Sequence, residues 1–147
     1  MNEMRVVPWL LVLVAPVFLG AAQSEQEAKQ KRLTIGSSLF RTNCASCHGV
    51  DGKGEGPVAD QLKFAPSDLT TIARRNGGEF PLDEMRRMID GRMSVKGHGA
   101  TDMPVWGDAF KKPEEKYSAK KAQEKIGYVL EFMESFQVRE KPNLPSG

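Results

Sequence analysis

The segment Cys44-Ala45-Ser46-Cys47-His48 constrains this chain more than any other feature, because it contains both of the chain's cysteines. A disulfide between Cys44 and Cys47 would close a very small loop and remove little entropy from the unfolded chain, so stabilisation explains the pair poorly. C-x-x-C-H is instead the pattern typical of covalent haem attachment. One short loop can present two thiols to two vinyl groups on one porphyrin edge. The next residue, His48, can then bind the iron.

Two other chemistries use cysteines at this spacing. A thioredoxin-like dithiol needs a strand before the motif and a helix beginning at it. Here a helical pattern precedes the motif, and four glycines follow it between Gly49 and Gly56. A structural zinc site needs four ligands, and Cys47 and His48 are adjacent, which suits one tetrahedral ion poorly. Both alternatives are weaker than haem attachment, and further observations must decide among the three.

A second axial ligand must come from farther along the chain. The candidates are Met85, Met88, Met93, His98, Met103 and Met133. Core packing is the expected role of the three that lie on apolar faces of predicted helices, Met85, Met88 and Met133. Met103 differs because it lies in a predicted loop beside Pro104, which holds the segment extended. Thioether ligation favours reduced iron. Met103 is therefore the predicted ligand, with His98 as runner-up.

The N-terminus has the pattern of a secretory signal. Arg5 precedes an apolar run over residues 6–19, and the small residues Gly20 and Ala22 follow it. This order predicts a signal peptide over residues 1–22 with cleavage after Ala22, and hence a periplasmic protein. The alternative is an uncleaved membrane anchor, although the run is short for a bilayer span.

Helical spacing dominates the rest of the chain. Residues 23–32 are polar and predict a linker or frayed lead-in. From Leu33 the apolar residues recur every three or four positions, which predicts a helix running into the cysteine motif. The same reasoning predicts helical segments at 59–62, 70–77, 81–91 and 118–137. With no alternating strand pattern, the expected class is all-α, with a domain over residues 33–138 and a flexible tail over residues 139–147.

Charge and composition limit the partners. The chain has 147 residues and a formal net charge of +2, with 21 basic and 19 acidic residues mixed throughout. A nucleic-acid binder would show a basic stripe with interleaved aromatic residues, and none is visible. We expect a single soluble domain that binds no nucleic acid and, after signal cleavage, does not insert stably into the membrane.

The chain from about Leu33 to Gln137 resembles the class I cytochrome c family. The resemblance is carried by Gly36 and Phe40, the haem motif, Gly56-Pro57, Asp102-Met103-Pro104 and the final helix over residues 129–136. It implies a small all-α cytochrome c-type fold around one covalently attached haem c. It also implies a bacterial monohaem electron carrier, not an enzyme, that serves an electron-transport chain through redox partner proteins.

The resemblance also implies how the first and last helices meet. In the family they cross closely, with a glycine on one helix allowing an aromatic residue of the other to lie against it. Gly36 matches the glycine. Phe132 matches the aromatic position, with Tyr128 as the alternative.

Roles around the haem follow from the resemblance as well. The carbonyl of Pro57 is expected to accept a hydrogen bond from the second ring nitrogen of His48. Arg92 and Trp106 flank the methionine loop, where the family places groups near the haem propionates. The long stretch over residues 78–101 departs from the mitochondrial form and indicates a bacterial subtype.

Three alternatives to a free electron carrier stay open. One is a cytochrome subunit associated permanently with a dehydrogenase or reductase. Another is a gas-binding haem protein with an open sixth position, and the last is a thiol–disulfide enzyme.

Overall fold

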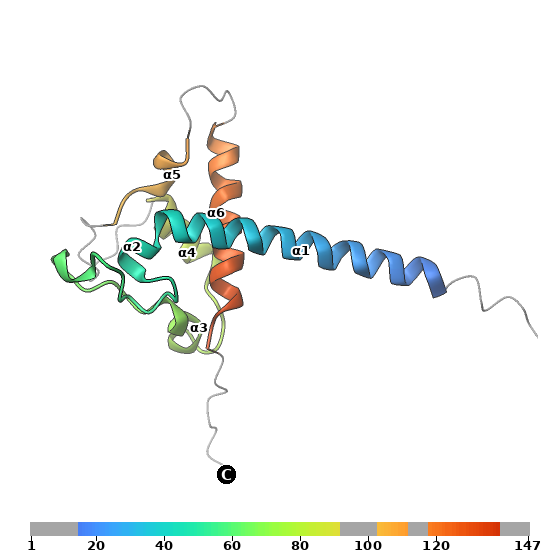
Figure 1. Cartoon of the computed structure of the whole chain (residues 1–147), viewed down its shortest axis with the longest axis horizontal. Helices are drawn as coiled ribbons and strands as arrows, with labels where there is room; N and C mark the ends of the chain where they lie inside the picture. The colour runs from blue at the N-terminus through green and yellow to red at the C-terminus, as the bar shows by residue number, and fades with distance from the viewer. Residues whose placement is uncertain (1–14, 92–102, 112–117, 139–147) are drawn as a thin grey trace, which may run out of the picture. The chain divides into compact units, whose positions relative to one another are not determined.

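The computed structural model describes residues 15–91, 103–111 and 118–138, and these ranges contain helices and loops without a strand (Figure 1). The start of the signal segment, Arg92, His98 and the expected tail lie outside the described residues. The chain divides into two compact units, residues 1–31 and residues 32–147. The all-α prediction is confirmed.

The first unit contains the beginning of α1 (Ala15–Asn43). Residues 23–32, expected to form a linker or frayed lead-in, are regular helix instead, with exposed side chains from residue 22 to residue 31. Glu, Gln and Lys are strong helix formers that need no core contact, which explains the difference. Within the described ranges, no helix is both long enough and apolar enough to cross a membrane.

The second unit contains the remaining elements. Those between the motif and the middle of the chain are short: α2 (Ala45–His48), η2 (Ala59–Gln61), η3 (Leu69–Thr71) and α3 (Ile72–Arg75). They are followed by α4 (Leu82–Asp90), α5 (Trp106–Ala109) and α6 (Ser118–Ser135). The predicted helical segments match η2, η3 with α3, α4 and α6, whereas the sequence pattern did not reveal α2 and α5. Both are single turns of four residues, too short for a periodic apolar pattern.

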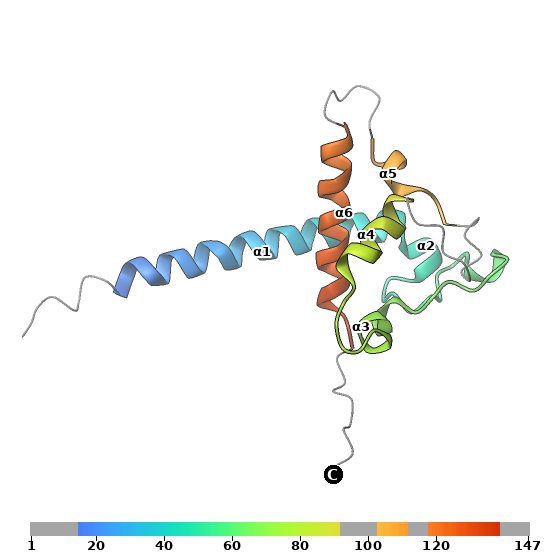
Figure 2. The same ribbon diagram turned by 180° about the vertical axis from the view of Figure 1, so that it is seen from behind.

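The core of the second unit lies where α4, α5 and α6 pack against one another (Figure 2). The apolar stripe of α6 supplies its largest share, because side chains spaced three or four apart share one helix face. The buried members of the core are Phe40, Ala45, Leu69, Ile72, Met85, Ile89, Phe110, Ala122, Ile126, Val129, Leu130 and Met133.

Within this unit, α1 contacts α6 at Gly36. A Cβ atom placed there would overlap the carbonyl oxygen of Tyr128 and lie 2.9 Å from Cβ of Phe132. Only glycine fits so close an approach of two backbones. The ring of Phe132 then lies 5.6 Å from that of Phe40, centroid to centroid. Phe132 is therefore the aromatic partner at this crossing, as expected, while Tyr128 contributes its backbone.

The glycine-rich turn after the motif brings a distant segment beside it. Gly54 has a φ of 88°, a left-handed conformation that favours glycine, and its Cα lies against the carbonyl of Pro66. The N–H of Leu69 donates to the carbonyl of Gly52 at 2.7 Å. These contacts hold residues 66–69 next to the cysteine motif.

Candidate haem site

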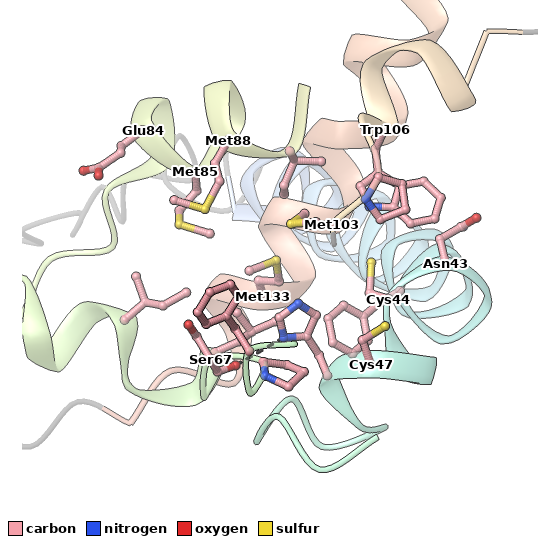
Figure 3. A pocket seen from close by; sticks show the side chains of 18 of the residues that line it. Asn43, Cys44, Cys47, Ser67, Glu84, Met85, Met88, Met103, Trp106 and Met133 are labelled. Carbon is pink, nitrogen blue, oxygen red and sulfur yellow. Dashed lines mark hydrogen bonds between the residues drawn. The ribbon is translucent and has the colours of Figure 1, made fainter. Parts of the chain in front are cut away.

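A cavity of about 510 Å³ lies in the second unit and contains the cysteine motif in its wall. Its volume is typical of a pocket for a cofactor or similar ligand. Figure 3 shows Cys44, Cys47, Met103 and Met133 around this space. The other labelled wall residues are Asn43, Ser67, Glu84, Met85, Met88 and Trp106.

The two cysteines do not form a disulfide with each other, and both are half-buried. The N–H of Cys44 continues the hydrogen bonding of α1 by donating to the carbonyl of Phe40 at 2.8 Å. The motif then forms the single turn α2. Burial, together with the neighbouring Cys47, raises the pKa of the Cys44 thiol to about 12. The nucleophilic cysteine of a reactive dithiol has a lowered pKa, and the pKa of Cys44 is shifted in the opposite direction.

The imidazole of His48 is held by one backbone carbonyl. Its Nδ1 atom lies 3.2 Å from the carbonyl oxygen of Ser67 (dashed line in Figure 3). A carbonyl can only accept, so Nδ1 carries the proton and Nε2 keeps its lone pair. An imidazole oriented in this way is suited to binding a metal through Nε2.

The prediction that the carbonyl of Pro57 accepts a hydrogen bond from His48 is wrong. Pro57 is exposed, and the acceptor is Ser67, ten residues farther along. The cause is the glycine-rich turn: the N–H of Gly56 donates to the carbonyl of Cys47 at 3.0 Å, which holds Gly56 against the motif backbone. The chain brings a carbonyl to the imidazole at Ser67. Pro66, the next proline after Pro57, was the one signal in the sequence that could have indicated a partner for His48 in this segment.

Burial lowers the pKa of His48 from its usual value of 6.5, while the hydrogen bond to Ser67 opposes that shift. The net direction favours the neutral ring, which is the form that binds iron.

Among the methionines of the described ranges, Met85, Met88, Met103 and Met133 line the cavity, while Met93 lies outside those ranges. Met85 and Met133 belong to the buried core, with 7% and 3% exposure, as the sequence predicted. Met88 is half-buried beside them. Met103 is 38% exposed and lies in the non-helical residues before α5.

Trp106 begins α5 and lies in the cavity wall. It is half-buried, and its ring lies 5.6 Å from that of Phe110. Trp106 is therefore a residue of the cavity wall that the sequence had indicated.

Several polar residues of the wall were not predicted from the sequence, including Arg75 and Glu84. The guanidinium of Arg75 donates to Oγ1 of Thr71 at 2.7 Å and to the carbonyl of Asp68 at 3.0 Å. Arg75 is an ordinary charged residue at the end of a short helix, and only the folding of α3 beside the cavity gives it this place.

Comparison with known proteins gives the family. The family model described as cytochrome c matches residues 33–136, most of the chain, so the chain belongs to the cytochrome c family. No curated protein and no solved structure matches it significantly. Family membership establishes a haem-binding electron carrier whose haem c, containing iron, is attached covalently.

The residues of the cavity fit that group. Two thiols stand at the spacing of the attachment motif, and the adjacent imidazole has an available Nε2 lone pair. The rest of the wall is mostly apolar, which suits a porphyrin face, and it includes thioethers able to bind iron.

Proposed function

We propose that this protein is a one-electron carrier of a periplasmic electron-transport chain, with His48 and Met103 as the axial ligands of its haem. The observation that carries the proposal is that one cavity wall contains both thiols, His48 and the thioether of Met103. When bound, haem c supplies an iron that alternates between the ferric and ferrous states. The protein makes and breaks no substrate bond in this role.

Each group of the chain has a defined task. Cys44 and Cys47 hold the haem, so that it cannot dissociate into the periplasm. His48 presents Nε2 in a fixed orientation because its Nδ1–H donates to Ser67. The apolar wall excludes water, which reduces the reorganisation that accompanies a change of charge.

Met103 is favoured over the other methionines of the cavity wall because binding iron would cost it the least packing. Met85 and Met133 are buried in the core, and drawing either toward the iron would leave a void there. Met88 sits on α4, whose place is fixed by its packing against α6. Met103 has no such commitment, since more than a third of its side chain is exposed.

Export is part of the proposal and rests on the N-terminal pattern. Cleavage after Ala22 releases the protein into the periplasm, whereas an uncleaved segment keeps it anchored to the membrane. Mass determination of protein purified from a periplasmic fraction distinguishes the two forms.

The alternative is a cytochrome subunit held permanently by a dehydrogenase or reductase. Its support is the exposure of large apolar side chains outside the cavity wall, with Val50 at 74% and Val105 at 47%. Purification from the native host separates the two: a stoichiometric partner that survives high salt favours the subunit, and a monomer favours the free carrier.

Replacement of Met103 by Ala tests the ligation. The variant should keep its covalent haem, lose the absorption band of sulfur bound to ferric iron, bind carbon monoxide readily in the ferrous state, and have a lower reduction potential. Met88→Leu is the matched control, because it removes another cavity thioether and should leave the band in place. If Met103→Ala retains the band while Met88→Leu loses it, the assignment is wrong.

A further inference from the structure

The side-chain amide of Gln137 makes three hydrogen bonds just beyond the end of α6. Its Nε2 donates to the carbonyls of Leu69 and Met133, both at 2.8 Å. Its Oε1 accepts from the N–H of Ala73 at 2.9 Å. Both N–H donors and the oxygen of the amide are therefore used. Two of the three bonds join the end of α6 to the segment that forms η3 and α3, and Figures 1 and 2 show these elements side by side.

The segment tied down in this way is continuous with the partner of His48. Leu69 lies two residues after Ser67, whose carbonyl faces the imidazole. On one side, the N–H of Leu69 donates to Gly52 of the glycine-rich turn at 2.7 Å. On the other side, the carbonyl of Leu69 accepts from Gln137. The backbone that carries the Ser67 carbonyl is thus held between the turn and α6.

A third hydrogen bond, between two backbone groups, reinforces the same attachment. The backbone N–H of Val138 donates to the carbonyl of Thr70 at 2.8 Å. Gln137 itself is half-buried, so its three bonds are partly shielded from water. Hydrogen bonds that leave no polar group unpaired specify one arrangement of the elements they join.

We propose that Gln137 is a positioning residue for the axial histidine: it holds the Ser67 carbonyl against Nδ1–H of His48 and so sets how strongly the imidazole donates to iron. The inference rests on the proposed function only in that His48 binds the haem iron. A firm acceptor on Nδ1–H increases the basicity of a ligating histidine. Stronger donation stabilises ferric iron and lowers the reduction potential.

Loosening the attachment should therefore have two linked effects. The Nδ1 proton of His48 should exchange with solvent faster, because its acceptor spends less time in place. The reduction potential should rise, because the imidazole becomes a weaker donor. A residue that only stabilised the fold would produce neither effect while the protein stays folded.

The test uses the haem-loaded full chain with Gln137→Met, which keeps the side chain's length and removes all three hydrogen bonds. In ferrous protein, NMR should detect severalfold faster solvent exchange of the Nδ1 proton. Mutating a group that hydrogen-bonds directly to a metal ligand alters metal affinity about 10–100-fold. Gln137 acts on His48 only through the segment that carries the Ser67 carbonyl, so its replacement should shift the ferric–ferrous equilibrium about threefold. That shift corresponds to roughly 28 mV upward for a one-electron couple.

Ile126→Val is the matched control. Ile126 is fully buried on α6 and lies outside the cavity wall, so the variant loses core stability without removing a hydrogen bond of residues 67–73. It should keep the wild-type exchange rate and potential. Val138→Pro is a second variant: it removes the N–H that donates to Thr70 and keeps the side-chain amide of Gln137, while its ring also restricts the backbone of Gln137. It should change both quantities in the same direction as Gln137→Met.

The outcomes separate this inference from the proposed function. If the wild-type protein has no His48 ligand on iron, the proposed function is overturned before any variant is compared. If the ligand is present but both variants keep the wild-type exchange rate and potential, Gln137 and Val138 have only a structural role and the inference is overturned.

Discussion

Gly36 of α1 packs directly against the backbone carbonyl of Tyr128 of α6. A side chain of any size is excluded there, because a Cβ atom would overlap the carbonyl oxygen and lie 2.8 Å from the carbonyl carbon. The contact sets how closely the backbones of the two helices approach each other. It also places the Phe40 ring, which is fully buried, against α6 and in the wall of the cavity.

Gly36→Ala should therefore destabilise the protein. Forcing a methyl group into a packed contact costs about 1–3 kcal/mol in free energy of unfolding. Gly127→Ala on α6 is the matched control, since the nearest atoms to its Cβ are the guanidinium nitrogens of Arg86 at 3.9 Å. This control should be neutral or stabilise the helix by up to about 1 kcal/mol. Urea unfolding of the haem-loaded variants measures both, and equal losses would contradict the close crossing.

Phe40→Leu should cost stability through its ring contacts. The Phe40 ring centroid lies 5.6 Å from that of Phe132 and 5.9 Å from that of Phe136. Each such pair contributes about 0.5–1.5 kcal/mol beyond buried area. A double-mutant cycle with Phe132→Leu should give a coupling energy in that range for the first pair. Strictly additive effects would mean that the rings pack without specific interaction.

The ion pair between Arg32 and Glu131 should matter little. The two groups are 2.9 Å apart, but both side chains are 40% exposed. Exposed pairs of this kind contribute about 0–1 kcal/mol and weaken as salt rises. Glu131→Gln should lower the free energy of unfolding by less than about 1 kcal/mol in low salt, and the difference should shrink in high salt. A larger loss that salt does not reduce would show that this pair contributes more than an exposed pair does.

Asp68 should make stability depend on pH in the acid range. Burial raises the pKa of its carboxyl, but hydrogen bonds from Thr70 and the charges of Arg75 and Arg74 outweigh burial, so the pKa in the folded protein lies below 3.8. A folded pKa below the unfolded value means that the ionised group stabilises the fold at higher pH. That contribution is lost as the pH falls through the folded pKa.

The comparison is between wild type and Asp68→Asn, which keeps the acceptor oxygen and removes the charge. The wild type should be more stable by a constant amount above about pH 5, and the difference should disappear below the folded pKa. Chemical unfolding at a series of pH values measures it. A difference that grows on acidification would contradict the lowered pKa.

The sequence identified the parts of the fold that depend on local pattern. The haem motif, the helix that runs into it and the long apolar stripe of α6 could all be predicted, because spacing alone defines them. Residues 23–32 could not, since a polar helix without an apolar face looks the same as a linker in sequence.

The site was predictable only in its covalent and apolar parts. Ser67 took the role expected of Pro57 because a backbone carbonyl carries no side-chain signal, and the folding of the glycine-rich turn decides which carbonyl reaches the imidazole. Arg75 and Gln137 were missed for a related reason. Their partners lie on other elements, and a polar residue at the end of a helix normally faces solvent.

The central claim is that Cys44 and Cys47 hold one haem covalently. The most direct test is the mass of the denatured protein after maturation in a periplasm, together with its visible absorption after acid extraction. We predict a mass equal to the chain plus one haem, no titratable thiol, and colour that stays with the protein. A colourless protein with the mass of the bare chain and two free thiols would contradict the account.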